Sequence, residues 1–290
     1  MARAPLGKTT YWNSRICFDQ ECIDEDWDLV YKPSKNPVYR SQYVFDLAER
    51  HLRIILRIYS SGGDIGKLDT YYSGLLQAWE LSNHLSEEIC NNHNLDNCRD
   101  WNFELNNLNH YIWCFWLVGL AITLDIPENQ WSRLINLIGS DGQDELLDRL
   151  IATRQPGRKI GTVLLHPKPY KRLLSAVLAS EDQQPELLKS FVEYWYKELN
   201  RPGHQQPYWY LYGDPDNHPL DMGSYFGRWC IEAAAVAKAF NIDDSLCLGH
   251  EHYPGDLLRP NGPTTHKVRQ EDNSAHKKSN WLSRFFNSKQ

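Results

Sequence analysis

The sequence predicts an all-α fold in which two consecutive helical segments pack as a bundle-like body, followed by a flexible basic tail. Three observations support this. Apolar residues recur at steps of three and four positions, the period-2 alternation of strands is nearly absent, and glycine, proline or aspartate stands where helices should begin or end. Hydrophobic residues make up 41% of the 290 positions, which is enough to form a buried core.

The first helical segment is expected to cover residues 36–153, after an N-terminal extension of residues 1–35. Its first helix should stop at Gly62-Gly63, and Asp64 should cap the second. Pro127 marks the start of the fourth helix. The five helices are expected over residues 43–61, 65–79, 101–124, 127–138 and 143–151.

A linker is expected over residues 154–169, because the stretch from Thr153 to Pro169 holds three prolines and two glycines. The second helical segment then covers residues 170–258. Its helices are expected over residues 170–179, 185–199 and 223–240, with an aromatic loop between the last two. Residues 259–290 are polar and basic and are expected to form a mobile tail.

Charge is distributed unevenly along the chain. The net charge is −6, but the tail holds seven basic and two acidic residues, so that residues 1–258 carry a net charge of −11. Residues 203–256 hold eight acidic residues against only Arg228 and Lys238. Such a surface repels nucleic acid and speeds encounter with a basic partner, although ordinary solubilising charge also accounts for this composition.

The composition also indicates a cellular compartment. The longest apolar stretch, residues 111–124, is too short to span a membrane, and residues 1–30 lack the apolar region of a signal peptide. The seven cysteines form an odd count without a CxxC pair, so reduced thiols are expected. We therefore expect a cytoplasmic protein that does not bind a membrane.

No motif of a known catalytic class is present, since GxSxG, Walker and GxGxxG patterns are absent. His250-Glu251-His252, with His218, Asp243 and Asp244 nearby in sequence, makes a metal site conceivable, but the spacing matches no known ligand pattern. We expect no catalytic residue, no metal ion and no cofactor. A metal-dependent hydrolase built around His218, His250 and His252 stays open as an alternative.

Glu232 is the most informative carboxylate because it precedes the small apolar run 233–237 and should be buried. A buried charge must be paired or hydrogen-bonded. The partner could be Arg228, one helical turn earlier, or a Trp N–H or Tyr O–H group. Either arrangement gives Glu232 a structural role.

The aromatic loop is the best candidate for partner contact. No Lys or Arg lies between Arg201 and Arg228, so the loop lacks the basic residues that a nucleic-acid binder needs. Trp209 is equally compatible with the core. The residues expected to steer a partner are Asp214, Asp216, Asp221, Asp243 and Asp244, and those expected to anchor it are Tyr208, Trp209 and Tyr212.

Residues 225–245 and 253–257 resemble the C-terminal domain of PoNi-type immunity proteins. The residues that match this pattern, with one departure at Arg228, are Tyr225, Gly227, Trp229, Glu232, Tyr253, Pro254 and Asp256. His252 also departs, because it replaces the first Tyr of Tyr-Tyr-Pro. The first half is similar to the N-terminal domain at Arg57-Ile58-Tyr59-Ser60, at Gly62-Gly63-Asp64, and at Gly139-Ser140-Asp141 with Asp144.

This resemblance implies an all-helical protein that protects a bacterium in interbacterial competition. Such a protein binds the toxic domain of a cognate polymorphic nuclease toxin that a secretion system delivers. An acidic body could block the basic cleft that a DNase needs for phosphate. A helical regulatory scaffold with an unrelated partner is the third possibility, and the sequence leaves the oligomeric state open.

Overall fold

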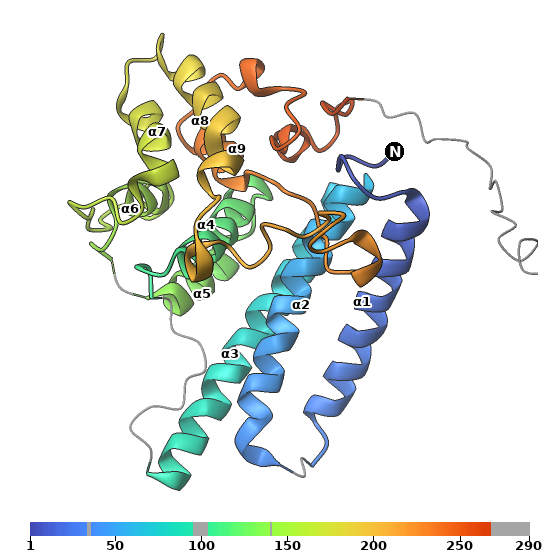
Figure 1. Ribbon diagram of the computed structural model, residues 1–290. Helices are drawn as coiled ribbons and strands as arrows, with labels where there is room; N and C mark the ends of the chain where they lie inside the picture. The colour runs from blue at the N-terminus through green and yellow to red at the C-terminus, as the bar shows by residue number, and fades with distance from the viewer. Residues whose placement is uncertain (34–35, 95–103, 140, 268–290) are drawn as a thin grey trace, which may run out of the picture.

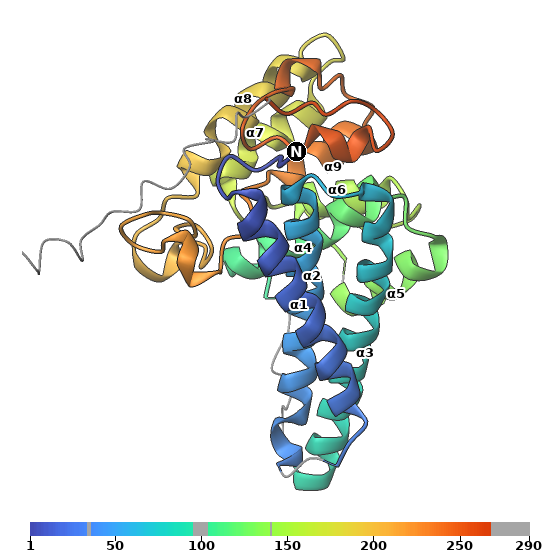
Figure 2. The same ribbon diagram turned by 90° about the vertical axis from the view of Figure 1, so that its right-hand side faces the viewer.

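The computed structural model describes residues 1–33, 36–94, 104–139 and 141–267 (Figure 1). Over these ranges the chain forms nine α-helices and several short 3-10 turns but no β-strand, which confirms the all-α prediction. The long helices of the first part of the chain project as an arm from a body of shorter helices (Figures 1 and 2). None of the helices in the described ranges is both long and apolar enough to cross a bilayer.

The arm consists of α1 (Thr9–Val30), α2 (Arg40–Ser61) and α3 (Leu68–His93), with α2 packed against both of the others. Helix α2 ends at Gly62 as predicted, and the Asp64 side chain accepts a hydrogen bond from Gly66 N just before α3. These helix ends were predictable because their signals are local.

Helix α1 was missed by the sequence analysis, which treated residues 1–35 as an extension. Its buried stripe is narrow, since within the helix only Trp12, Asp19, Ile23 and Val30 are buried. Because five acidic residues crowd its second half, the helix has little amphipathic contrast on which a periodicity argument could act.

The body is built around α4 (Leu108–Thr123), which is buried from Tyr111 to Thr123. Helix α9 (Ile231–Ala239) packs directly on α4 at Gly119, where a Cβ atom would lie 2.8 Å from Ile231 Cγ2. A helix of the first predicted segment and one of the second therefore share one core. The remaining helices are α5 (Glu128–Ile138), α6 (Glu145–Ala152), α7 (Pro167–Leu178) and α8 (Gln184–Glu198).

Three expectations about this part of the fold were wrong. Residues 104–107 precede α4 and are not helical, and residues 101–103 lie outside the described residues. Residues 223–230 are also not helical, and α9 begins only at Ile231, because this segment lies against the end of α2.

Residues 259–267 belong to the folded body, since Arg259 pairs with Asp244 and Thr265 binds Asp256. Residues 268–290 of the expected tail lie outside the described residues.

The cysteines also differ from expectation at one position. Cys90 in α3 is disulfide-bonded, and Cys98 lies outside the described residues. Five others, Cys17, Cys22, Cys114, Cys230 and Cys247, are free thiols as predicted.

Candidate functional site

The residues that resemble the two PoNi domains meet in the interior, where the end of α2 contacts the segment 223–230. We call this contact the joint. The Ser60 hydroxyl donates to the Phe226 carbonyl over 2.7 Å and accepts from Trp229 Nε1 over 2.8 Å. The Tyr59 ring packs edge-on against Trp229, with 5.0 Å between ring centroids. The joint thus connects parts of the chain more than 160 residues apart.

A buried ion pair extends the joint to α1. The Arg57 guanidinium on α2 pairs with Asp19 on α1 and donates to the Gly223 carbonyl over 2.5 Å. Both side chains are at most 3% exposed. The pair therefore holds α1, α2 and the start of the segment 223–230 together.

Gly227 allows the chain to pass through the joint. Its φ is +103°, in the region that favours glycine, and a Cβ atom would overlap with Trp229 Nε1 and Ser60 Oγ. We expect Gly227→Ala to lower the free energy of unfolding by about 2 to 3 kcal/mol, through backbone strain and overpacking. Urea denaturation would measure this, with Gly157→Ala as a control because Gly157 also has a positive φ but nothing near its Cβ position. Equal losses in both variants would contradict crowding at the joint.

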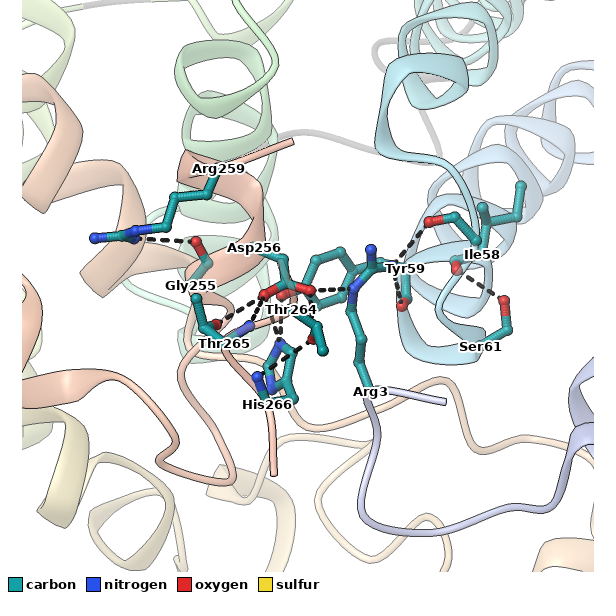
Figure 3. A network of polar contacts seen from close by, with 11 residues as sticks. Arg3, Ile58, Tyr59, Ser61, Gly255, Asp256, Arg259, Thr264, Thr265 and His266 are labelled. Atoms are coloured by element: carbon teal, nitrogen blue, oxygen red, sulfur yellow. Dashed lines mark hydrogen bonds and ion pairs between the residues drawn. The ribbon is translucent and has the colours of Figure 1, made fainter. Parts of the chain in front are cut away.

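Asp256 forms hydrogen bonds with residues from both described ends of the chain, beside the joint (Figure 3). Its carboxylate accepts from Arg3 Nε over 2.6 Å and from Thr264 and Thr265. Although burial opposes this effect, these hydrogen bonds hold the pKa of Asp256 below its usual value. Arg3 also donates to the Tyr59 and Gly63 carbonyls at the end of α2. His266 Nε2 lies 2.8 Å from the Tyr59 hydroxyl.

Glu232 lies at the first turn of α9 and is fully buried. One oxygen accepts from Tyr170 over 2.9 Å and from Trp195 over 3.3 Å, and the other accepts from Trp116 over 3.3 Å. Burial raises the pKa of Glu232 to about 7, although these donors favour the charged form. The prediction of Trp and Tyr donors is confirmed.

The alternative partner of Glu232, Arg228, is wrong. Arg228 precedes α9, donates to the Tyr212 carbonyl over 2.9 Å, and lies over the Tyr196 ring. Of the residues quoted from the C-terminal PoNi pattern, all except Arg228 are buried. The pattern therefore describes an interior, and a surface for a partner must be sought elsewhere.

The loop between α8 and α9 brings together part of the predicted partner-binding surface. Asp216, Asp221 and Tyr208 are exposed on the loop between α8 and α9, and Tyr212 is half-buried against His218. Asp214 shapes this loop, because its carboxylate accepts from Asn217 N over 2.8 Å, which also lowers the pKa of Asp214.

Other predicted surface residues lie elsewhere. Trp209 is 2% exposed, stacks on Trp195 and packs against a tilted Trp116 ring, so it is a core residue and not an accessible anchor. Asp244 is buried, where it binds Tyr253 and Arg259, so it is not available for steering. Asp243 is exposed and accepts from Ser245 N in a separate turn, which packs next to α8.

The alternative metal site is not assembled. His252 is buried beside Trp195 and Tyr196, where burial lowers its pKa to about 4. His250 lies next to it, but His218 packs on Tyr212 in the aromatic loop. Within the described ranges, no three His, Cys, Asp or Glu side chains are grouped so that they could hold a metal ion.

One acidic surface was missed by the sequence analysis. Four carboxylates on α1, those of Glu21, Asp24, Glu25 and Asp28, are exposed. The run of acidic residues was visible in the sequence, but without the helix it could not be assigned to a face.

Two protein-family models match consecutive parts of the chain. The N-terminal model of the PoNe immunity proteins (PoNi) matches residues 3–136, and the C-terminal model matches residues 142–257. The chain belongs to the PoNi family. The predicted resemblance is confirmed, and membership in PoNi implies an immunity protein that acts against a PoNe nuclease toxin.

The fold has a counterpart among solved structures. The crystal structure of protein PA2201 from Pseudomonas aeruginosa superposes with a TM-score of 0.66, covers 89% of this chain and 90% of its own, and is 16% identical. This likeness supports the fold alone. No curated protein sequence matches this PoNi chain.

Proposed function

We propose that this PoNi protein binds the DNase domain of its cognate PoNe toxin without catalysing a reaction, and that an acidic face covers the basic cleft of the toxin. The observation that supports this most directly is the loop between α8 and α9. It exposes Asp216, Asp221 and Tyr208, and it lies in a stretch without Lys or Arg between Arg201 and Arg228.

A DNase needs positive charge to hold the phosphate backbone, so its active cleft attracts an acidic surface. The charge accelerates the encounter, and an exposed aromatic side chain such as Tyr208 slows dissociation. DNA is then excluded because the same basic groups are occupied.

The cellular setting is part of the proposal. The protein would act in the cytoplasm of the producing cell against a toxin that a secretion system delivers. The disulfide of Cys90 is less common in that compartment, so cell fractionation would test this location independently. Co-expression with the toxin, scored by survival and co-purification, would test immunity itself.

The double variant Asp216→Lys, Asp221→Lys should associate with the toxin domain about tenfold more slowly at low salt, and the rate should depend less on salt. Stopped-flow measurement at several salt concentrations would record both effects. Asp214 is left unchanged because it shapes the loop. The matched control is Glu181→Lys, Asp182→Lys, on the exposed turn between α7 and α8. If the two double variants associate at the same rate, steering by this loop is wrong.

A further inference from the structure

The far end of the arm carries a groove that no described part of the chain fills. It lies where α1 ends and α2 begins, at the end of the arm farthest from the body (Figure 1). Its volume is about 340 Å³, and Leu29, Tyr39 and Tyr43 contribute to its lining. Leu29 is 51% exposed and Tyr39 is 67% exposed. These exposed side chains could receive an apolar side chain of a partner.

The exposed face of α1 leads to this groove. Phe18, Glu21, Glu25 and Asp28 follow one another at steps of three and four residues, so they lie on one face of the helix. All four are exposed, and Phe18 is an apolar side chain among the carboxylates.

The carboxylates of this face differ from the other acidic residues of α1 in their ion pairs among the described residues. Two other acidic residues of α1 are paired, Asp19 with Arg57 and Asp26 with Arg50. Among the described residues, no ion pair joins Glu21, Glu25 or Asp28 to a basic side chain. Two basic residues also line the groove. Lys32 is exposed, and the Arg40 guanidinium donates to the Val30 carbonyl at the end of α1, so the negative charge lies along α1 and not in the groove.

The charge of this face selects among possible occupants. A second copy of the chain would bring identical carboxylates together, which is unfavourable. An anionic polynucleotide or membrane surface is repelled for the same reason. A basic protein with an exposed apolar side chain can pair with the carboxylates and fill the groove.

We infer that the toxin domain docks along α1, with an apolar toxin side chain in the groove at the end of the arm. This inference rests on the proposed function and specifies its surface. The aromatic loop lies beside the upper part of α1, as Figure 2 shows, and Tyr11 on α1 donates to the Tyr225 carbonyl over 2.7 Å. The face of α1 and the exposed carboxylates of that loop can therefore contact one partner.

The test uses the full chain and, as the probe, the cognate toxin domain with its nuclease active site inactivated. We expect Leu29→Ser, Tyr39→Ser to raise the dissociation rate at least tenfold, because side chains that fill pockets dominate the lifetime of an interface. Leu178→Ser is the matched control, since Leu178 on α7 is 55% exposed but lies on the body. Circular dichroism would verify that each variant keeps its helices.

The charged face is tested separately by Glu21→Lys, Glu25→Lys, with Glu181→Lys, Asp182→Lys as its control. We expect slower association at low salt only for the α1 variant. Hydrogen exchange in the complex should protect residues 17–32 and 36–43.

The outcomes separate the inference from the proposed function. If the unmodified protein binds the toxin domain but the α1 and groove variants bind equally well, or if exchange protection spares the arm, the inference is overturned while the proposed function stands. If the unmodified protein does not bind, the proposed function fails as well.

Discussion

Replacing Arg57 by alanine should lower the free energy of unfolding by about 3 to 5 kcal/mol, the cost of leaving a buried charge without its partner. Asp19 is 1% exposed and receives the Arg57 guanidinium, so the variant would strand a carboxylate between α1 and α2. The Gly223 carbonyl would also lose a donor. Urea denaturation at pH 7 would measure the loss.

Two further variants make this prediction specific. Arg133→Ala removes a more exposed partner of Glu80 and should cost at most about 1 kcal/mol. The double variant Asp19→Leu, Arg57→Met replaces both charges by apolar groups and should recover most of the loss, since a hydrophobic pair avoids desolvation of the ions. If Arg57→Ala costs no more than Arg133→Ala, the ion pair does not hold the joint.

The second large effect concerns pH. The pKa of Glu232 is about 7 in the folded protein against an ordinary value of 4.5, because burial disfavours the carboxylate. Below pH 4.5 the group is protonated in both states and has no effect. Between pH 4.5 and 7 the unfolded chain releases the proton first, so rising pH destabilises the folded state. Above pH 7 the folded protein bears the full cost of ionising buried Glu232, about 3 kcal/mol.

Glu232→Gln should remove this pH dependence, because glutamine does not ionise. Its oxygen can still accept from Tyr170 and Trp195, but the amide nitrogen would face the Trp116 N–H, so the variant should be less stable near pH 5. As pH rises to 8, the difference should shift in favour of the variant by about 3 kcal/mol. Denaturation at pH 5, 6, 7 and 8 tests this, and parallel stability profiles would contradict it.

The fold was predictable where its signals are local. Gly62, Asp64 and Pro127 mark helix ends through backbone preferences of their own, and the structure agrees with each. The segment 223–230 was misjudged because Tyr225, Phe226 and Trp229 have helix-like spacing, while their conformation is decided by contact with Ser60. That contact has no signature in the neighbouring sequence.

In the candidate partner surface, too, exposure depends on contacts that are distant in sequence. Tyr208 and Trp209 are adjacent and chemically alike, yet Tyr208 is exposed and Trp209 is buried. The difference arises from Trp116 on α4 and Trp195 on α8, which no spacing argument could place beside Trp209. Asp243 and Asp244 differ likewise, because Arg259 reaches only Asp244 as an ion-pair partner.

The joint also has a consequence for protein synthesis. Ser60 binds partners 166 and 169 residues later, so these contacts form only after the ribosome has made both halves. At elongation rates of about 5 to 20 residues per second, Trp229 is synthesised roughly 10 to 30 seconds after the end of α2. Contacts of such long range close late in folding. Closure of the joint is therefore expected among the last steps in the folding of a newly translated chain.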